Sequence, residues 1–246
     1  MIQHSFPTRR SSDLTSTEVG GLAVAAGGYT LVPASTTFEA GAARPFEFRV
    51  DGPDRKPVTR FVVAHDKPLH LIVVRRDLSG YQHLHPTMTP DGTWRTDLTL
   101  PAAGVWRAYA DFTAATPGGT QAAFTLGVDL TVAGAYQPVA LPEAARRATV
   151  EGLTVSYAGT PSVGSTQPLL FTVPGVTLER YLGAYGHLVV LREGDLGYVH
   201  VHPEERLSGG AVKFWLAAPS PGRYRMFFDC QVAGKVHTAA YTVVVS

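Results

Sequence analysis

The feature that most constrains this chain is an internal repeat that contains most of its histidines. Residues 65–86 align without a gap with residues 182–203, and residues 101–111 align with residues 219–229. Self-similarity over this distance indicates that a whole domain has been duplicated, and a copy of about 100 residues has an ordinary domain size. The matched polar residues are His70 with His187, His83 with His200, His85 with His202, and Asp111 with Asp229.

Short runs of β-branched and aromatic residues recur within each copy, separated by turns rich in Gly, Pro and Asp. In the first copy these runs are residues 29–32, 46–50, 60–63, 70–75, 82–85, 94–100, 105–112 and 123–132. A helical period with capping residues is missing, apart from a turn at residues 142–146. The pattern predicts an all-β fold of two tandem antiparallel β-sandwich domains, of the immunoglobulin-like or cupredoxin-like kind.

Composition shifts place the domain boundaries. We expect the first sandwich at residues 15–134, a linker at 135–147 and the second sandwich at 148–246. Residues 1–14 contain the string HSFPTRRSSDL, which resembles a translated sequencing adapter, so we treat them as an artefact. If the natural start was lost there, a signal peptide could have been lost with it. The missing export signal therefore does not argue for a cytoplasmic protein.

Charge and composition exclude several classes of protein. The net charge is +1 without a basic cluster, which excludes a nucleic-acid binder. The single cysteine excludes an intramolecular disulfide or a multi-cysteine metal site. Cys230 has no following methionine and its counterpart in the first copy is Phe112, so the sequence does not fit a blue-copper centre. We expect Cys230 in the core.

The histidines predict a candidate metal site in each copy. In a strand, His-x-His places both imidazoles on one face, and burying Leu84 or Val201 between them turns the histidines outward or to a sheet rim. Three imidazoles and one carboxylate suit a divalent transition metal, with copper favoured and zinc the second choice. The two candidate sets are His70, His83, His85 and Asp111, and His187, His200, His202 and Asp229.

A structural interpretation stays open beside the metal site. The imidazoles could bond loop carbonyls and Pro86 or Pro203 could end a strand, and duplication copies a packing motif as faithfully as a binding site. His65 and His237 are weaker candidates, because Leu182 replaces His65 in the second copy and His237 lies beyond the shared motif. No motif with a nucleophile and base is present, so we expect no enzyme; a hydrolase site between the domains is a third alternative.

The segments HLIVVRRDLSGYQHLHP and YLGAYGHLVVLREGDLGYVHVHP resemble a family of bacterial exported proteins, often loosely described as secreted or heavy-metal-binding. The resemblance covers residues 20–245 and implies β-sandwich modules outside the cytoplasm, without implying a demonstrated activity. We therefore expect an exported, non-enzymatic protein whose partner is a metal ion bound by the histidines. The alternative is a cell-envelope structural or protein-interaction module, in which the partner is an envelope protein and the histidines are purely structural.

Overall fold

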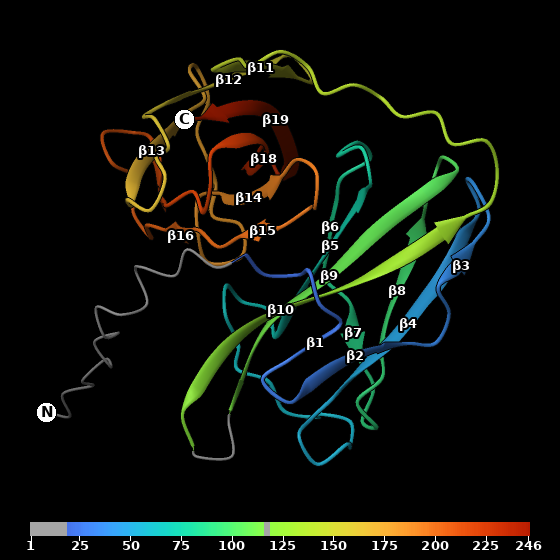
Figure 1. Ribbon diagram of the computed structural model, residues 1–246. Coiled ribbons are helices and arrows are strands. Elements are labelled where there is room, and N and C mark those ends of the chain that lie inside the picture. Colours follow the sequence, from blue (N-terminus) through green and yellow to red (C-terminus); the bar gives the residue numbers. More distant parts are fainter. Residues whose placement is uncertain (1–18, 116–118) are drawn as a thin grey trace, which may run out of the picture.

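The computed structural model describes residues 19–115 and 119–246, except for the side chain of His202. These residues form two β-sandwich domains that lie side by side (Figure 1), so the predicted all-β, two-sandwich fold is confirmed. Residues 1–14, assigned to an adapter from their sequence, lie outside the described residues. Within the described residues, nothing forms a helix with the length and apolar character that membrane crossing requires.

The first sandwich has two five-stranded sheets in the described part of the chain. One sheet has the order β1-β2-β4-β8-β7, with β1 at Ala25–Ala26, β2 at Tyr29–Pro33, β4 at Ala43–Asp51, β7 at Thr87–Met88 and β8 at Trp94–Thr99. The other has the order β3-β10-β9-β5-β6, with β3 at Thr37–Phe38, β5 at Leu69–Arg75, β6 at Gln82–Leu84, β9 at Gly104–Ala115 and β10 at Gln121–Val132.

The second sandwich repeats this plan with fewer strands in one sheet. One sheet has the order β11-β12-β13-β17-β16, with β11 at Arg147–Val150, β12 at Leu153–Ala158, β13 at Gln167–Thr172, β16 at His202–Pro203 and β17 at Val212–Leu216. The other has the order β15-β14-β18-β19, with β14 at His187–Arg192, β15 at Tyr198–Val199, β18 at Gly222–Val232 and β19 at Lys235–Val245.

The strand expected at residues 60–63 is wrong. Only Val62 pairs there, with Thr113 at the end of β9, and Val63 is 64% exposed. The chain turns back at residues 64–67 immediately afterwards, which leaves too little extended backbone for a strand. This segment instead delivers a tight turn to the neighbourhood of the histidines.

Each sandwich encloses its own core, built from strand residues that alternate between inside and outside. In β9, Trp106, Ala108 and Ala110 point into the first core, as their spacing predicts. In β18, Met226 and Cys230 point into the second core, and Cys230 is a buried free thiol as expected. The intervening residues of β9 and β18 therefore face outward from the sandwiches.

Those outward faces meet, so the two repeats dock through the same surface. The second sandwich lies with β14 and β15 against the edge that carries β5, β6 and β9 (Figure 1). The contact is apolar and buried, and each large side chain removed from water contributes about 1.5–3 kcal/mol. The residues of this interdomain cluster are Ile72, Val74, Leu78 and Tyr109 from the first repeat, and Val189, Leu191, Leu196, Tyr198 and Phe227 from the second.

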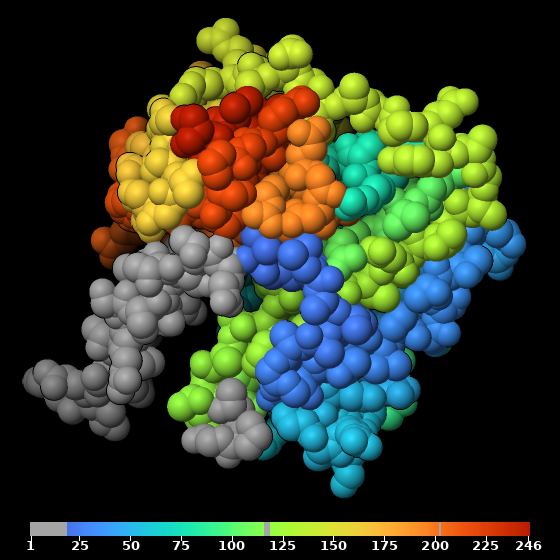
Figure 2. All heavy atoms as spheres, viewed as in Figure 1, coloured from blue at the N-terminus to red at the C-terminus, as the bar shows by residue number. Residues whose placement is uncertain are grey.

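The cluster has approximate two-fold symmetry, because repeat-equivalent residues meet across it. Tyr81 of the first repeat stacks on Phe227 of the second, with ring centres 4.0 Å apart, and Tyr198 of the second packs on Tyr109 of the first. Such a contact between like surfaces is the arrangement of a symmetric dimer, here within one chain. Residues 133–146 connect the two halves along the top of the molecule (Figure 2).

Candidate metal centre

Two rows of polar side chains cross the docked sheets at equivalent positions. In the first sandwich His70 pairs in register with Asp111, and Asp111 with Thr125. In the second, His187 pairs with Asp229, and Asp229 with Thr238. Residues directly opposite each other in a sheet share a face, so each row lies on the outward face of its sandwich. Docking brings the two rows together between the domains.

A tight turn fixes each of the two strand histidines. His70 Nε2 lies 3.2 Å from the carbonyl oxygen of Ala64, and His187 Nε2 lies 3.0 Å from that of Tyr181. A carbonyl only accepts, so Nε2 carries the hydrogen in both rings. When each ring is neutral, its Nδ1 therefore has a free lone pair.

The turn that anchors His70 has an unusual backbone. His65 and Asp66 have φ values of 51° and 58°, in the left-handed region that residues other than glycine, asparagine and aspartate rarely occupy. The equivalent turn of the second repeat uses Leu182 and Gly183. Backbone strain of this kind persists where the surrounding structure holds it, often at functional sites.

His83 is held by a carboxylate from the other domain. Its Nδ1 lies 2.8 Å from Oδ2 of Asp229, and both side chains are almost fully buried. The same carboxylate accepts the hydroxyls of Tyr81 at 3.0 Å and Thr238 at 2.5 Å. A carboxylate also only accepts, so His83 Nδ1 carries the hydrogen and Nε2 has the free lone pair.

This contact corrects the grouping derived from the sequence, which placed Asp229 with the histidines of its own repeat. The carboxylate instead orients a histidine of the first repeat, because the two motif-bearing faces are docked against each other. Asp111, grouped with the first set, accepts the hydroxyl of Thr125 at 2.7 Å. Burial raises the pKa of Asp111, and the nearby imidazoles of His200 and His65 oppose that rise.

The two free lone pairs of His70 and His83 point at each other. His70 Nδ1 and His83 Nε2 are 3.1 Å apart, although neither carries a hydrogen when its other nitrogen donates to Ala64 or Asp229. Two acceptors at this distance are incompatible with neutral rings unless a cation lies with them. The geometry therefore favours a positive charge at this point.

His85 adds a third nitrogen to the same place. One ring nitrogen from each of His70, His83 and His85 lies within 4.8 Å of the others, and His85 Nε2 is buried without a hydrogen-bond partner. The ring centres are 5.3, 5.2 and 4.8 Å apart. Three imidazoles on one tetrahedral metal, with metal–nitrogen bonds of about 2.1 Å, would have ring centres about 5 Å apart. We call these three residues the histidine triad.

Burial keeps most of these rings neutral at pH 7. Burial, reinforced by His83, lowers the pKa of His70 to about 2. Burial also lowers the pKa of His85 and of His187 to about 4 in each case. The neutral imidazole is the form that binds a metal, so protons compete weakly for these nitrogens.

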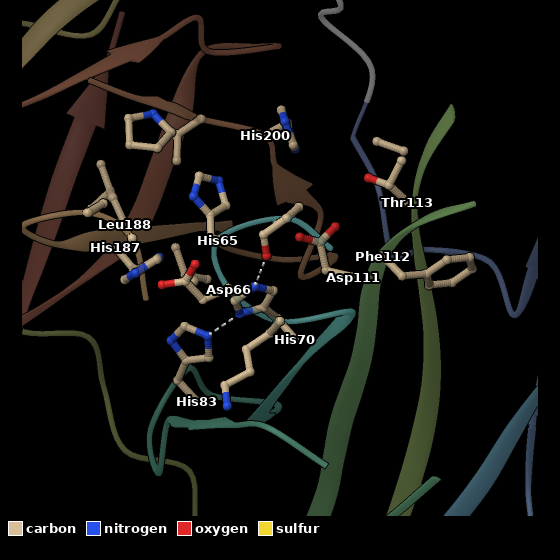
Figure 3. Close-up of a pocket in the computed structure, with 18 of the residues that line it drawn as sticks. His65, Asp66, His70, His83, Asp111, Phe112, Thr113, His187, Leu188 and His200 are labelled. Carbon is tan, nitrogen blue, oxygen red and sulfur yellow. Dashed lines mark hydrogen bonds between the residues drawn. The ribbon is translucent and has the colours of Figure 1, made fainter. Parts of the chain in front are cut away.

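A cavity of about 620 Å³ opens between the domains beside the triad. Figure 3 shows His70 and His83 on one side, with His187 and His65 facing them and Asp111 and His200 farther along. His65 lies 5.5 Å from His187 between ring centres. Its sequence made His65 a weak candidate, because its counterpart in the second repeat is Leu182. The turn contains His65 and Asp66 in the first repeat and Leu182 and Gly183 in the second, and this difference could have identified His65.

The second repeat does not assemble an equivalent triad among the described side chains. The strand β15 ends at Val199, and the backbone at His202 pairs with Trp215 of the opposite sheet. In the first repeat the corresponding residue, His85, follows β6 directly and stays beside β5. The earlier switch between sheets leaves His200 exposed outside a strand and breaks the two-residue alternation that the prediction assumed.

Comparisons with known proteins provide a family and distant structural matches. Similar solved structures include a mutant Salmonella alpha-2-macroglobulin, at 15% identity and a TM-score of 0.31, covering 95% of this chain and 15% of that chain. The Escherichia coli adhesin FdeC is 16% identical, with a TM-score of 0.28 and coverage of 91% and 66%. Invasin, a bacterial integrin-binding protein, is 15% identical, with a TM-score of 0.28 and coverage of 91% and 41%.

This chain thus spans less than two thirds of each of these proteins. At such TM-scores the likeness says nothing of function. Among curated proteins there is no match. A family model matches residues 23–130 and 148–246, one stretch in each sandwich and together well over half of the chain. The protein therefore belongs to the family described as Domain of unknown function (DUF8832).

Proposed function

We propose that this protein is an extracytoplasmic, non-enzymatic binding protein that holds one divalent transition metal ion at the histidine triad. The observation that carries the proposal is the 3.1 Å approach of His70 Nδ1 to His83 Nε2, two nitrogens whose partners leave both without a hydrogen. A metal ion bound by both lone pairs removes this conflict. It also gives His85 Nε2 the partner that it lacks.

The surroundings of the triad support a metal more than a proton. A proton on His83 would also bridge the two nitrogens, because His83 would then donate to both Asp229 and His70, but it would leave His85 Nε2 without a partner. The contacts to Ala64 and Asp229 match the way metal-bound histidines donate their second N–H to a carbonyl or carboxylate, which fixes the ring and raises its basicity.

The donor set favours copper or zinc. Imidazole nitrogen suits both ions, and a site without oxygen ligands disfavours calcium and magnesium. For a given nitrogen site, Cu(II) binds more tightly than Zn(II). We therefore propose copper as the first choice and zinc as the second.

A second candidate function is a cell-envelope interaction module in which the histidines only fasten the two domains together. The hydrogen bond of His83 to Asp229 favours it, because this bond links the two domains without a metal, and the bonds of His70 to Ala64 and of His187 to Tyr181 hold a turn within each domain. This second function gives the buried Nε2 of His85 no partner, and an apolar residue at that position would pack there without leaving a polar atom unsatisfied.

Titration of chelator-treated protein with Cu(II) and Zn(II) separates the two functions. The parent is expected to bind one equivalent, and His85→Ala is the preferred variant because it removes a ligand without breaking a hydrogen bond. We expect its affinity to fall at least about tenfold, within the 10–100-fold loss typical even of outer contacts to a metal ligand.

His237→Gln is the matched control, because His237 is a similarly buried histidine that does not line the cavity. Its affinity for the metal should equal that of the parent. Stoichiometric binding lost only in His85→Ala supports the metal site. Weak binding that is the same in all three proteins would exclude it and leave the interaction module.

A further inference from the structure

We infer that His187 of the second domain provides a fourth nitrogen to the metal at the histidine triad, so that the ion fastens the two sandwiches to each other. This inference rests on the proposed function, because it concerns the same metal. It changes the nature of the site from three ligands within one domain to a centre that is complete only when both domains are docked.

The orientation of His187 is the first support. Its Nε2 donates to the carbonyl oxygen of Tyr181, so its free lone pair lies on Nδ1, as it does in His70. The ring is almost fully buried and lines the same cavity as His70 and His83. In Figure 3, His187 faces His83 across the domain boundary.

The spacing of the rings is the second support. The ring centre of His187 lies 5.8 Å from that of His83 and 6.1 Å from that of His70. For imidazoles on a shared metal these separations correspond to nitrogen–metal–nitrogen angles of about 130–145°, against about 110° for a tetrahedron. A flattened four-nitrogen arrangement is one that Cu(II) accepts more readily than Zn(II). His187 is not among the residues whose ligand nitrogens lie within 4.8 Å of one another, so its ring has to move toward the triad when the metal binds, by about 1 Å for the tetrahedral spacing that zinc prefers.

The connectivity around Asp229 is the third support. Asp229 lies opposite His187 in the sheet, and its carboxylate orients His83 of the first domain. The second domain therefore contributes Asp229, which positions the ligand His83, and also contributes His187, the proposed fourth ligand. A single sandwich contains neither arrangement alone.

Nitrogen counting in the metal-loaded full-length protein tests the inference. Electron paramagnetic resonance of the Cu(II) form, with hyperfine coupling to ligand nitrogen, is expected to report four imidazoles in the parent and three in His187→Ala. We expect the affinity of His187→Ala to fall about tenfold or more. His200→Ala is the matched control, since His200 is the other second-domain histidine that lines the cavity but is exposed; four nitrogens should remain.

Hydrogen exchange tests independently whether the metal links the two domains. Copper is expected to protect backbone amides in both anchoring turns, residues 64–67 and 181–184, in the parent. In His187→Ala it should protect only the first turn. If the alanine variant does not fold, His187→Gln keeps a donor near the Tyr181 carbonyl and serves in its place.

The outcomes separate this inference from the proposed function. Parent protein with three nitrogens, and an unchanged spectrum and affinity in His187→Ala, would overturn the fourth ligand while the triad stands. A parent that binds no copper above the level of His85→Ala would overturn both. Four nitrogens that become three only in the His187 variants support the centre between the domains.

Discussion

At the scale of single residues, the site depends on which nitrogen of each ring carries a hydrogen. His70 and His187 each face a backbone carbonyl oxygen, and His83 faces the carboxylate of Asp229. Each of these oxygens accepts a hydrogen, so the nitrogen beside it must be the donor. These contacts decide where the lone pairs lie before any ligand arrives. The pairing of hydrogen-bond partners is therefore the physical reason why the proposed site would favour a cation.

Asp229 should matter more than its repeat counterpart Asp111. Asp229→Asn removes a buried charge that accepts three hydrogen bonds, from Tyr81, His83 and Thr238. We expect a loss of about 1.5–3 kcal/mol in the free energy of unfolding for the charged bond to His83. Metal affinity should fall about 10–100-fold, because the ring orientation of a ligand is no longer fixed.

Asp111→Asn is the control for that experiment. Its carboxylate accepts a hydrogen bond from Thr125, and burial raises its pKa, so the charged form is already disfavoured there. Denaturant unfolding of both variants at pH 7 should show the smaller loss for Asp111→Asn. Equal losses would mean that the crossed contact to His83 has no special role.

At the scale of elements, the turn at residues 64–67 holds aspartate where the second repeat holds glycine. Asp66→Gly relieves the strain of a side chain at φ of 58°. The greater freedom of glycine in the unfolded chain offsets part of this gain, so we expect the free energy of unfolding to rise by about 0.5–1 kcal/mol. Gly183→Ala, at φ of 76°, should lower it by about 1–2 kcal/mol. Thermal unfolding measures both, and a loss in Asp66→Gly would mean that the aspartate side chain stabilises the turn.

Asp77 fastens the linker to the first sandwich and should make stability depend on pH. Its carboxylate accepts the backbone N–H of Val139 at 2.8 Å and the hydroxyl of Ser79 at 2.6 Å, beside Arg75. Burial alone would raise the pKa of Asp77, but the bonds from Ser79 and Val139 and the charge of Arg75 lower it below its ordinary 3.8.

A lowered pKa in the folded state stabilises the protein above pH 3.8, and this stabilisation is lost as the pH falls through the folded pKa. Asp77→Asn should therefore be less stable than the parent at pH 7, by about 1.5–3 kcal/mol. The difference should begin to shrink below about pH 3.8, where Asp77 of the unfolded parent becomes protonated, and it disappears only below the lowered folded pKa. Urea unfolding at pH 7 and at pH 3.5 compares the two, and a constant difference would contradict the assignment.

Much of the fold was predictable from the sequence, because alternation along strands is a local property. The inward positions of β9 and β18 follow directly from side-chain parity. The convergence of His83 and His85 near His70 also follows from strand register. The crossed contact of His83 with Asp229 does not, since it depends on how two separately folded sandwiches dock.

The loss of symmetry in the second repeat was also beyond the sequence. The motif Tyr-x-His-x-His-Pro is the same in both copies, yet the second leaves its first sheet before His200. Where a strand changes sheet depends on the packing of its neighbours and not on the motif itself. Among the described side chains, the first repeat consequently brings three histidines together, and the second repeat supplies Asp229, which orients one of them.

At the scale of the whole molecule, the two repeats behave as a symmetric dimer joined by a linker. Leu191 is fully buried in the interdomain cluster, and Leu191→Ala should cost about 2–5 kcal/mol through the cavity it leaves. Because the substitution weakens the contact between the domains, calorimetry should show a single unfolding transition in the parent and a broadened or divided one in Leu191→Ala. Val244→Ala, at a position 57% exposed, is the control and should change stability by less than about 0.5 kcal/mol. Two separate transitions already present in the parent, with only one of them shifted in Leu191→Ala, would indicate that the domains do not stabilise each other.

The most direct test of the metal centre is X-ray absorption spectroscopy of the full-length protein loaded with one equivalent of copper. We predict a first shell of nitrogen at about 2.0 Å with the multiple-scattering pattern of several imidazole rings. The pattern should weaken in His85→Ala and persist in His237→Gln. A first shell without imidazole scattering, or copper that washes out before measurement, would contradict the central claim that these rings converge on a cation.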